Sequence, residues 1–305
     1  MRSLLKRSLL ASPTPRKTRR SGWRPLPTRP HPRPSSHRTR TVETRPILLS
    51  QTEGPVARLT LNRPEAGNSL SMDLVSALRA ELDRLAGCTD IKVIVLSGTG
   101  GRIFCAGHDL NEFAGDPDQD FLTRDFAGIT ALMQTIMVQP QIIIAKVEGV
   151  ATAAGCELVA ACDLALASSV ARFAVPGVNI GFWCHTPQVQ LSRTIGRKAA
   201  MMMLATGKLF NADHALRIGL INDVHPPEQL DQAVEDLAAT IATKSAAVLA
   251  LGKRSFHLQA PMPMTEAYRL AQDEALANLE HPDAQEGIAA FLEKRSPNWA
   301  AAQAP

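Results

Sequence analysis

The sequence lacks three features that would point to particular classes of protein. No run approaches the roughly 18 apolar residues of a membrane-spanning helix, so we expect no membrane span. The five cysteines are scattered and odd in number, and no CxxC pair occurs. This argues against a disulfide framework or a zinc site and fits a reducing compartment. Acidic residues, 29 in all, are absent from the first 42 positions.

The amino-terminal segment is a basic arm. Residues 1–42 hold ten Arg and two Lys, and seven prolines between Pro13 and Pro34 interrupt any helix. We therefore expect residues 1–46 to be disordered. An acid-free segment rich in Arg and Ser is typical of a mitochondrial transit peptide. The alternatives are a polybasic tail and upstream sequence translated from a mis-assigned start codon.

Charge separates this arm from the rest of the chain. The 21 basic and 29 acidic residues after position 42 give that part a net charge of −8. We therefore expect no nucleic-acid groove on the folded body. RNA binding through the basic arm is a separate hypothesis.

Apolar spacing predicts an α/β core followed by helices. Residues Met72–Leu85 carry leucines at helical spacing, and Ser71 is placed to cap that helix. Strands are predicted at 56–62, 90–98, 140–149, 163–169 and 171–176. Further helices are predicted at 120–137, 188–206, 212–217, 227–244, 265–279 and 284–294, and the pattern is all helical after Gly181. Strands alternating with helices and then a helical tail indicate an α/β core with a C-terminal helical module.

The stretch VEGVATAAGCELVAACD, residues 147–163, raises a chemical question because Glu157 lies in a small, apolar run. A buried carboxylate is costly unless it is paired or used. The N–H of Ala154 is expected at the positive end of a helix, with Glu157 on the same face one turn along. This suits a carbonyl compound whose oxygen becomes negative while a proton or water moves beside it. The alternative is a first-turn acid that only satisfies the helix dipole.

A second stretch, FCAGHDLNEF at residues 104–113, follows a predicted strand and carries Gly107 at a predicted tight turn. Such a turn can expose a backbone N–H to a ligand. A turn with no ligand is the simpler interpretation of this stretch alone.

Both stretches belong to a longer pattern. The motifs, in order, are LNRPEAGNSLS, CAGHDL, VEGVATAAGCELVAACDLALASSVARFAVPGVNIG, TGKLFNADHALRIGLINDV and DAQEGIAAFLEKR. Together they resemble the crotonase family of enoyl-CoA hydratases and isomerases, over about residues 47–297. The resemblance implies a spiral of ββα units at 47–225 and a C-terminal helical trimerisation region at 226–300. It also implies a homotrimer or a dimer of trimers, an acyl-CoA thioester ligand, no metal, and no cofactor beyond the coenzyme A of the substrate.

The resemblance assigns roles to individual residues. The thioester oxygen would accept the backbone N–H groups of His108 and Ala154, and Glu157 would act as general base or acid. The His108 side chain would face the acyl pocket. The resemblance also implies a set of residues that bind CoA: Arg63, Ala66, Asn68, Ala106, His108, Asp109, Leu110, Asn111, Ala154, Phe291 and Lys294. In the family, the residues at positions 291 and 294 often come from a neighbouring subunit.

One departure from the family pattern concerns the chemistry. Hydratases of the family use two glutamates, and the second falls at Gly177. No other acid lies between Phe173 and Pro187. Because loss of a general acid or base costs about 10²–10⁴-fold in rate, hydration would be weak or a substitute would act. The candidates at the acyl pocket, beside Gly177, are Asn179, Cys184 and His185.

We therefore predict an enoyl-CoA hydratase-like enzyme with a single glutamate. Acyl-CoA decarboxylation, enoyl-CoA isomerisation and a CoA-binding pseudoenzyme remain alternatives. Decarboxylation needs no general base, because loss of CO₂ itself generates the enolate. The methylmalonyl-CoA decarboxylase branch of the family, however, uses a tyrosine where this chain has Cys184. The expected location is the mitochondrial matrix in a eukaryote and the cytoplasm in a bacterium.

Overall fold

The structure is a computed structural model that describes residues 45–115 and 117–299. The predicted basic arm lies outside these residues, apart from its last two positions. No helix of the described part is long and apolar enough to cross a membrane.

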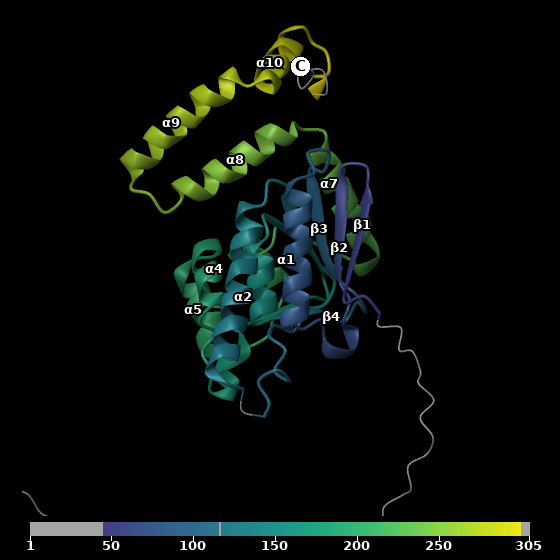
Figure 1. The fold of residues 1–305 in the computed structure, drawn as a ribbon, viewed down its shortest axis with the longest axis vertical. Helices are drawn as coiled ribbons and strands as arrows, with labels where there is room; N and C mark the ends of the chain where they lie inside the picture. Colours follow the sequence, from purple (N-terminus) through teal and green to yellow (C-terminus); the bar gives the residue numbers. More distant parts are fainter. Residues whose placement is uncertain (1–44, 116, 300–305) are drawn as a thin grey trace, which may run out of the picture. The chain divides into compact units, whose positions relative to one another are not determined.

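A six-stranded sheet forms the centre of the fold (Figure 1). Its strands lie in the order β1-β2-β3-β5-β7-β10. The pair β1–β2 is antiparallel, and the other neighbouring strands pair in parallel. Their bounds are β1 Leu48–Glu53, β2 Val56–Leu61, β3 Val93–Gly98, β5 Ile142–Val147, β7 Leu164–Ser168 and β10 Asp223–His225.

A second sheet is built from short strands that follow those of the first. Its order is β4-β6-β8-β9, with β4–β6 and β6–β8 parallel and β8–β9 antiparallel. The bounds are β4 Ile103–Cys105, β6 Val150–Thr152, β8 Arg172–Ala174 and β9 Phe210–Asn211. Strand β4 follows β3, β6 follows β5 and β8 follows β7, and each pair leads into a helix. Because the long strands are parallel, the segments after β3 and β5 leave the same edge of the sheet.

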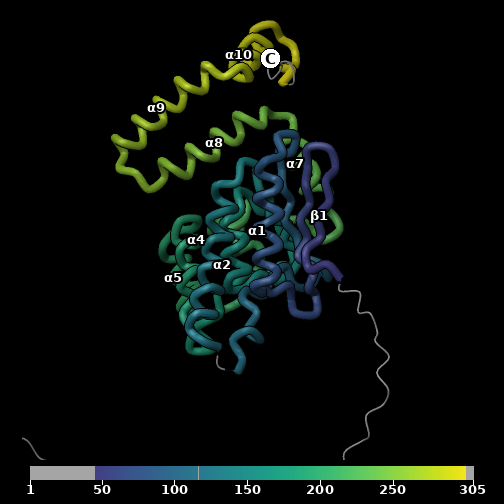
Figure 2. Tube along the Cα trace, in the orientation of Figure 1, coloured from purple at the N-terminus to yellow at the C-terminus, as the bar shows by residue number. Residues whose placement is uncertain are grey.

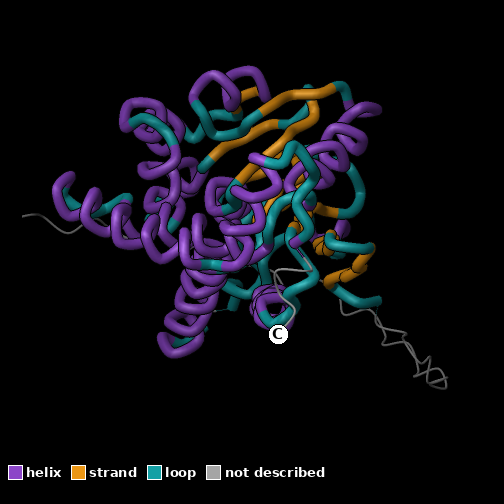
Figure 3. Tube along the Cα trace, turned by 90° about the horizontal axis from the view of Figure 1, so that it is seen from above, coloured by secondary structure: helices purple, strands orange, loops and turns teal. Residues whose placement is uncertain are grey.

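Alternating side chains of the main sheet face two separate apolar clusters. Val93 and Val95 of β3 pack with α7 (Leu230–Ala242), while Ile94 and Leu96 belong to the larger core on the other face. Successive strand residues point to opposite faces, and helices cover both faces of a parallel sheet. Strand β3 is therefore buried along its whole length. Figure 3 shows helices flanking the strands.

Helix α1 (Met72–Ala86) confirms the helix predicted from leucine spacing. Ser71 Oγ accepts the N–H of Leu74 at 3.3 Å, as a capping residue does. The four leucines Leu74, Leu78, Leu82 and Leu85 are buried, and α1 packs against α2 (Gln119–Val138).

The prediction that the chain is all helical after Gly181 is wrong. Strands β9 and β10 pair there with β8 and β7, which are distant in sequence. The helix predicted at 188–206 is two helices, α4 (Pro187–Thr194) and α5 (Arg197–Thr206), because Ile195 and Gly196 are extended. The predicted segments at 212–217, 265–279 and 284–294 are confirmed as α6 (Ala212–Ile218), α9 (Met264–Glu280) and α10 (Pro282–Leu292).

Helix α8 (Ala246–Gln259) is absent from the sequence-based prediction and joins the C-terminal helices to the core. It lies beside α9 (Figure 2), and it contacts α2 and β5. The buried ammonium of Lys253 donates to the carbonyl oxygens of Ile136 and Gln141, at 2.9 and 3.1 Å, and to Asp163 Oδ2 at 2.7 Å. Helix α7 packs on the main sheet, and α9 packs on α8.

Candidate active site

Glu157 lies in the first turn of α3 (Ala154–Ala161), a helix in which every residue is buried. Its side chain is almost fully enclosed, because the residue is only 3% exposed. Its Oε2 atom has no hydrogen-bond partner in the part of the chain that the structure describes. Burial raises the pKa of Glu157 to about 7, and the side chain of Thr186 opposes this shift. The carboxyl group therefore takes up and releases a proton near neutral pH.

Two turns interlock beside Glu157. A Cβ atom on Gly107, whose φ is +97°, would lie 2.8 Å from Cβ of Ala153 and 3.1 Å from the nitrogen of Ala154. A Cβ atom on Gly155 would overlap the carbonyl oxygen of Cys105. Both positions therefore require glycine, and the two turns, which follow β4 and β6, approach each other at backbone distance.

The backbone N–H groups of His108 and Ala154 are left without acceptors by this arrangement. Leu70 pairs with His108 in a parallel bridge, in which its N–H donates to the Gly107 carbonyl and its own carbonyl accepts the N–H of Asp109. The N–H of His108 consequently points away from Leu70. Ala154 is the first residue of α3 and has no helical carbonyl to bond. Neither N–H donates a backbone hydrogen bond within residues 45–115 and 117–299.

The residue before Ala154 has a strained backbone. Ala153 adopts φ 51° and ψ −121°, a conformation that residues with a Cβ rarely adopt. Its N–H donates to the Ala174 carbonyl at 2.9 Å, and its own carbonyl accepts the N–H groups of Cys156 and Glu157 at 3.0 Å. Hydrogen bonds on both sides therefore hold this peptide in place.

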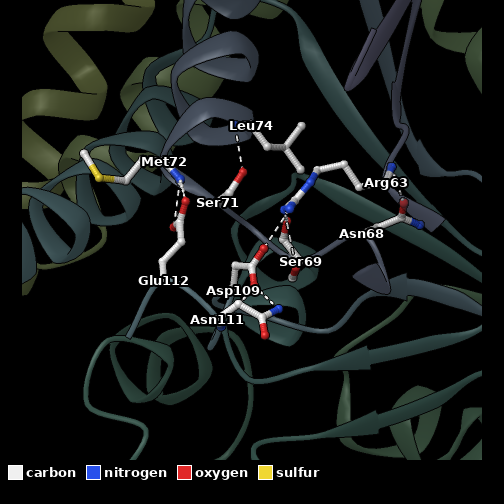
Figure 4. A network of polar contacts seen from close by, with 9 residues as sticks. All are labelled: Arg63, Asn68, Ser69, Ser71, Met72, Leu74, Asp109, Asn111 and Glu112. Carbon is white, nitrogen blue, oxygen red and sulfur yellow. Dashed lines mark hydrogen bonds and ion pairs between the residues drawn. The ribbon is translucent and has the colours of Figure 1, made fainter. Parts of the chain in front are cut away.

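A polar network supports the segment after Gly107 (Figure 4). Arg63 Nη2 lies 2.7 Å from Asp109 Oδ2, and its Nη1 donates to the Ser69 carbonyl at 2.7 Å. Asp109 Oδ1 accepts the side-chain amide of Asn111 at 2.9 Å. Burial alone would raise the pKa of Asp109, but the hydrogen bonds from Arg63 and Asn111 outweigh it and hold that pKa below its usual value. The polar atoms of Arg63 and Asp109 therefore bond to each other and to the backbone.

The residues predicted to bind CoA differ in how far their side chains are exposed to solvent. Asn68 is fully buried, and its amide nitrogen donates to the carbonyls of Thr99 and Ile103, so its side chain offers no free donor to a ligand. Leu110 is 59% exposed beside the Gly107 turn. Phe291, 82% exposed, and Lys294 lie at the end of α10 and face solvent in the single chain. Ala66 and Ala106 are half-buried.

Position 177, where the resemblance to the family places a second glutamate, has no room for a side chain. A Cβ atom on Gly177 would overlap the carbonyl oxygen of Phe182 and lie 2.9 Å from Sγ of Cys184. Cys184 is buried and lies within electrostatic range of Glu157. Asn179 instead donates to the Gly207 carbonyl at 3.2 Å, and His185 is exposed. Of the three residues that could replace the second glutamate, Cys184 is the one that lies close to Gly177 and within electrostatic range of Glu157.

The His108 side chain lies beside Asp125, a buried carboxyl group that the sequence gave no reason to place at the site. His108 Nε2 lies 3.5 Å from Asp125 Oδ2, and neither atom has a hydrogen-bond partner in the described chain. The His108 ring packs 5.7 Å from Phe113 and 5.1 Å from Phe126. Burial lowers the pKa of His108 to about 4, while burial and the Glu112 carboxylate raise the pKa of Asp125 to about 6. At neutral pH the imidazole is therefore uncharged, and the contact is not an ion pair.

Asp125 gave no signal in the sequence because it lies alone on the apolar face of α2, among Ile129, Leu132 and Met133. Thr186 also has no local motif, and only the folding of the 182–186 segment against α3 brings it to Glu157. Within the described ranges, no group of three or more His, Cys, Asp or Glu residues could hold a metal ion.

Comparisons with known proteins identify relatives of this chain. The sequence matches the enoyl-CoA hydratase/isomerase family over residues 51–302. It is 43% identical over 283 residues to the rat protein called enoyl-CoA hydratase domain-containing protein 3, mitochondrial, covering 92% of this chain and 93% of that protein. It is 34% identical over 255 residues to the 2,3-dehydroadipyl-CoA hydratase of Escherichia coli K12, covering 83% of this chain and 98% of that enzyme.

Solved structures give the same result. A crystal structure of an enoyl-CoA hydratase from Mycobacterium smegmatis matches with a TM-score of 0.81 and 43% identity, over 84% of this chain and 100% of that chain. The human enoyl-CoA hydratase domain-containing protein 3 matches with a TM-score of 0.81 and 38% identity, over 83% of this chain and 100% of that chain. The predicted α/β fold of the crotonase type is thereby confirmed, and the chain belongs to the enoyl-CoA hydratase/isomerase family.

Proposed function

We propose that this chain binds an acyl-CoA thioester and hydrates a 2-enoyl-CoA with Glu157 as its single catalytic carboxylate. The observation that carries the proposal is the carboxyl group of Glu157, which is buried and lacks a partner for Oε2. It begins the same helix as Ala154, whose N–H is free of backbone acceptors. Such a group costs folding free energy unless it is used.

The N–H groups of His108 and Ala154 would hold the thioester oxygen as it gains negative charge. Both belong to turns that Gly107 and Gly155 bring to backbone distance. Fixed backbone donors stabilise an oxyanion without reorganising during the reaction, and one such donor contributes about 10²–10³-fold to kcat.

Glu157 would take a proton from water as the water oxygen bonds to the β-carbon of the substrate. Its pKa of about 7 leaves a large ionised fraction at neutral pH while keeping the group basic enough to accept a proton. Activity should therefore rise as the pH increases through about 7, because the ionised form is the base.

A second candidate is a reaction that needs one acid or none: double-bond isomerisation or decarboxylation. It is favoured by Gly177, because the carbonyl of Phe182 leaves no space for the second glutamate. A third candidate is a pseudoenzyme, which would bind CoA but catalyse no reaction. Assays with malonyl-, methylmalonyl- and 3-enoyl-CoA thioesters, together with CoA binding, distinguish these cases.

The direct test is hydration of crotonyl-CoA by wild type and by Glu157→Gln. We expect the substitution to lower kcat by about 10²–10⁴-fold, the usual contribution of a general acid or base. Glu148→Gln is the matched control, because Glu148 pairs with Lys146 at 2.8 Å and is not among the proposed site residues. Equal rates for wild type and Glu157→Gln would show that the catalytic assignment is wrong.

For the assembly we propose a homotrimer or a dimer of trimers, formed through the C-terminal helices. Large apolar side chains on these helices are exposed in the single chain, including Tyr268, 70% exposed, and Leu279, 53% exposed. Exposed apolar surface of this kind marks contact surfaces. Phe291 and Lys294 would reach the CoA of a neighbouring subunit through the same assembly.

For the location we propose the mitochondrial matrix if the source is eukaryotic. The match to the rat relative, whose name includes "mitochondrial", covers 92% of the chain and so extends into residues 1–46. These residues have the composition of a transit peptide.

A further inference from the structure

The absent second carboxylate leaves open which group delivers a proton to the α-carbon. The three candidate substitutes named from the sequence follow Gly177 in the chain, and the structure separates them. Asn179 is exposed and its amide is directed at the Gly207 carbonyl, 3.2 Å away. His185 is exposed, and its ring meets the edge of Phe182 at 6.0 Å. Neither is directed toward Glu157.

Cys184 is placed differently. Its Sγ lies 2.9 Å from the point that Cβ of residue 177 would occupy, so the thiol stands where the side chain of the missing glutamate would begin. The backbone N–H of Gly177 faces this sulfur. Cys184 is 5% exposed.

An independent observation indicates that a ligand belongs beside this thiol. Glu157 is 97% buried, since only 3% of its surface is exposed, and its Oε2 lacks a partner in the described chain. The Glu157 charge acts on Cys184, so the two side chains lie within electrostatic range of each other. A buried carboxylate with a free oxygen is costly unless a ligand or water completes it.

We propose that the Cys184 thiol replaces the second glutamate as the proton donor to the α-carbon of the enoyl-CoA substrate. This rests on the proposed hydration and adds to it a second catalytic residue of a chemical type different from the first.

The proton and electron movements balance within the two residues and the substrate. Glu157 removes a proton from water while the water oxygen bonds to the β-carbon, and the π pair moves toward the thioester to form the enolate. The enolate pair then takes the proton of the Cys184 S–H at the α-carbon, which leaves a thiolate. The proton now on Glu157 passes to that thiolate, so both residues return to their starting states and one water has been added.

The environment of Cys184 suits an acid rather than a nucleophile. Burial raises the pKa of its thiol, the Gly177 N–H opposes this, and the Glu157 charge adds to the rise. The thiol therefore stays protonated at neutral pH, whereas a reactive cysteine has a lowered pKa.

The test measures kcat, KM and the pH profile of crotonyl-CoA hydration for wild type, Cys184→Ser and Cys184→Ala. Serine keeps the size and polarity but is a far weaker acid. We expect both substitutions to lower kcat by about 10²-fold or more, with little change in KM. In wild type we expect activity to fall at alkaline pH as the thiol ionises, and this alkaline limb should disappear in Cys184→Ser. Cys88→Ser, a half-buried thiol after α1, is the control for general loss of a cysteine.

The outcomes separate this inference from the function on which it rests. A Cys184→Ser enzyme with wild-type kcat and an unchanged alkaline limb would overturn the role of Cys184, provided that Glu157→Gln still abolishes hydration. If Glu157→Gln leaves hydration unchanged, the proposed function fails and this inference with it. If neither Cys184 variant folds, the wild-type pH profile decides, because absence of an alkaline limb also overturns the role of the thiol.

Discussion

A side chain at position 177 is expected to destabilise the fold. In Gly177→Ala the new methyl group would overlap the backbone carbonyl of Phe182 and press on Sγ of Cys184 at 2.9 Å. Backbone cannot move aside as the end of a flexible side chain can, so the cost lies near the upper end of the about 1–3 kcal/mol typical of overpacking. The hydrogen bond from the Phe182 N–H to the Gly177 carbonyl, 3.0 Å long, would also weaken.

Thermal unfolding at fixed protein concentration measures this effect. With about 2–4 °C lost per kcal/mol in a chain of this size, Gly177→Ala should unfold roughly 6–12 °C below wild type. Gly128→Ala in α2 is the control, because its Cβ would meet only Val75 Cγ1 at an ordinary 3.6 Å. There we expect a gain of about 0.5–1 kcal/mol. If Gly177→Ala is as stable as wild type, or if Gly177→Glu hydrates crotonyl-CoA faster, the steric reasoning is wrong.

Substitutions at three further positions test the energetics of the fold. Because the pKa of Glu157 rises from 4.5 to about 7 on folding, its contribution to stability is lost as the pH rises through that interval. Glu157→Gln should therefore be more stable than wild type in urea at pH 8.5 by up to about 3 kcal/mol, and the difference should vanish below pH 4.5. Lys253→Met leaves Asp163 without its ammonium partner and should cost about 3–5 kcal/mol in the same assay; an unchanged midpoint would contradict this. Ser71→Ala removes the cap of α1 and should cost about 1 kcal/mol, whereas Ser71→Asp should cost little.

The parts of the fold that follow from local chemistry were predictable. Ser71 and the leucine stripe of α1 act within one helix, and the apolar run of β5 needs no partner to be recognised. Strands β4 and β6 have three residues each and depend on pairing with strands distant in the sequence, β4 with β6 and β6 also with β8. Strand β10 pairs with β7 although more than fifty positions separate them in the sequence. No local sequence pattern predicts that pairing.

The same division applies to the candidate site. The burial of Glu157 could be predicted because its own neighbours in the sequence are small and apolar. Its raised pKa follows from that burial. Asp125 could not be linked to the site, and Cys184 could be named only as one of three candidates, because α2 and the 182–186 segment meet the α3 region only in the folded chain. Resemblance supplied the order of motifs, but it gave no sign that Gly177 is enclosed by Phe182.

The strained backbone of Ala153 links the stability of the fold to the orientation of the next peptide. Its conformation costs on the order of 1–3 kcal/mol, and the hydrogen bonds to Ala174, Cys156 and Glu157 prevent it from relaxing. A glycine at position 153 would relieve this backbone strain. It would also allow the following peptide to change orientation when those hydrogen bonds open. Under the proposed function, a glycine at position 153 would therefore gain stability but lose the fixed N–H direction at Ala154 that is proposed to hold the thioester oxygen.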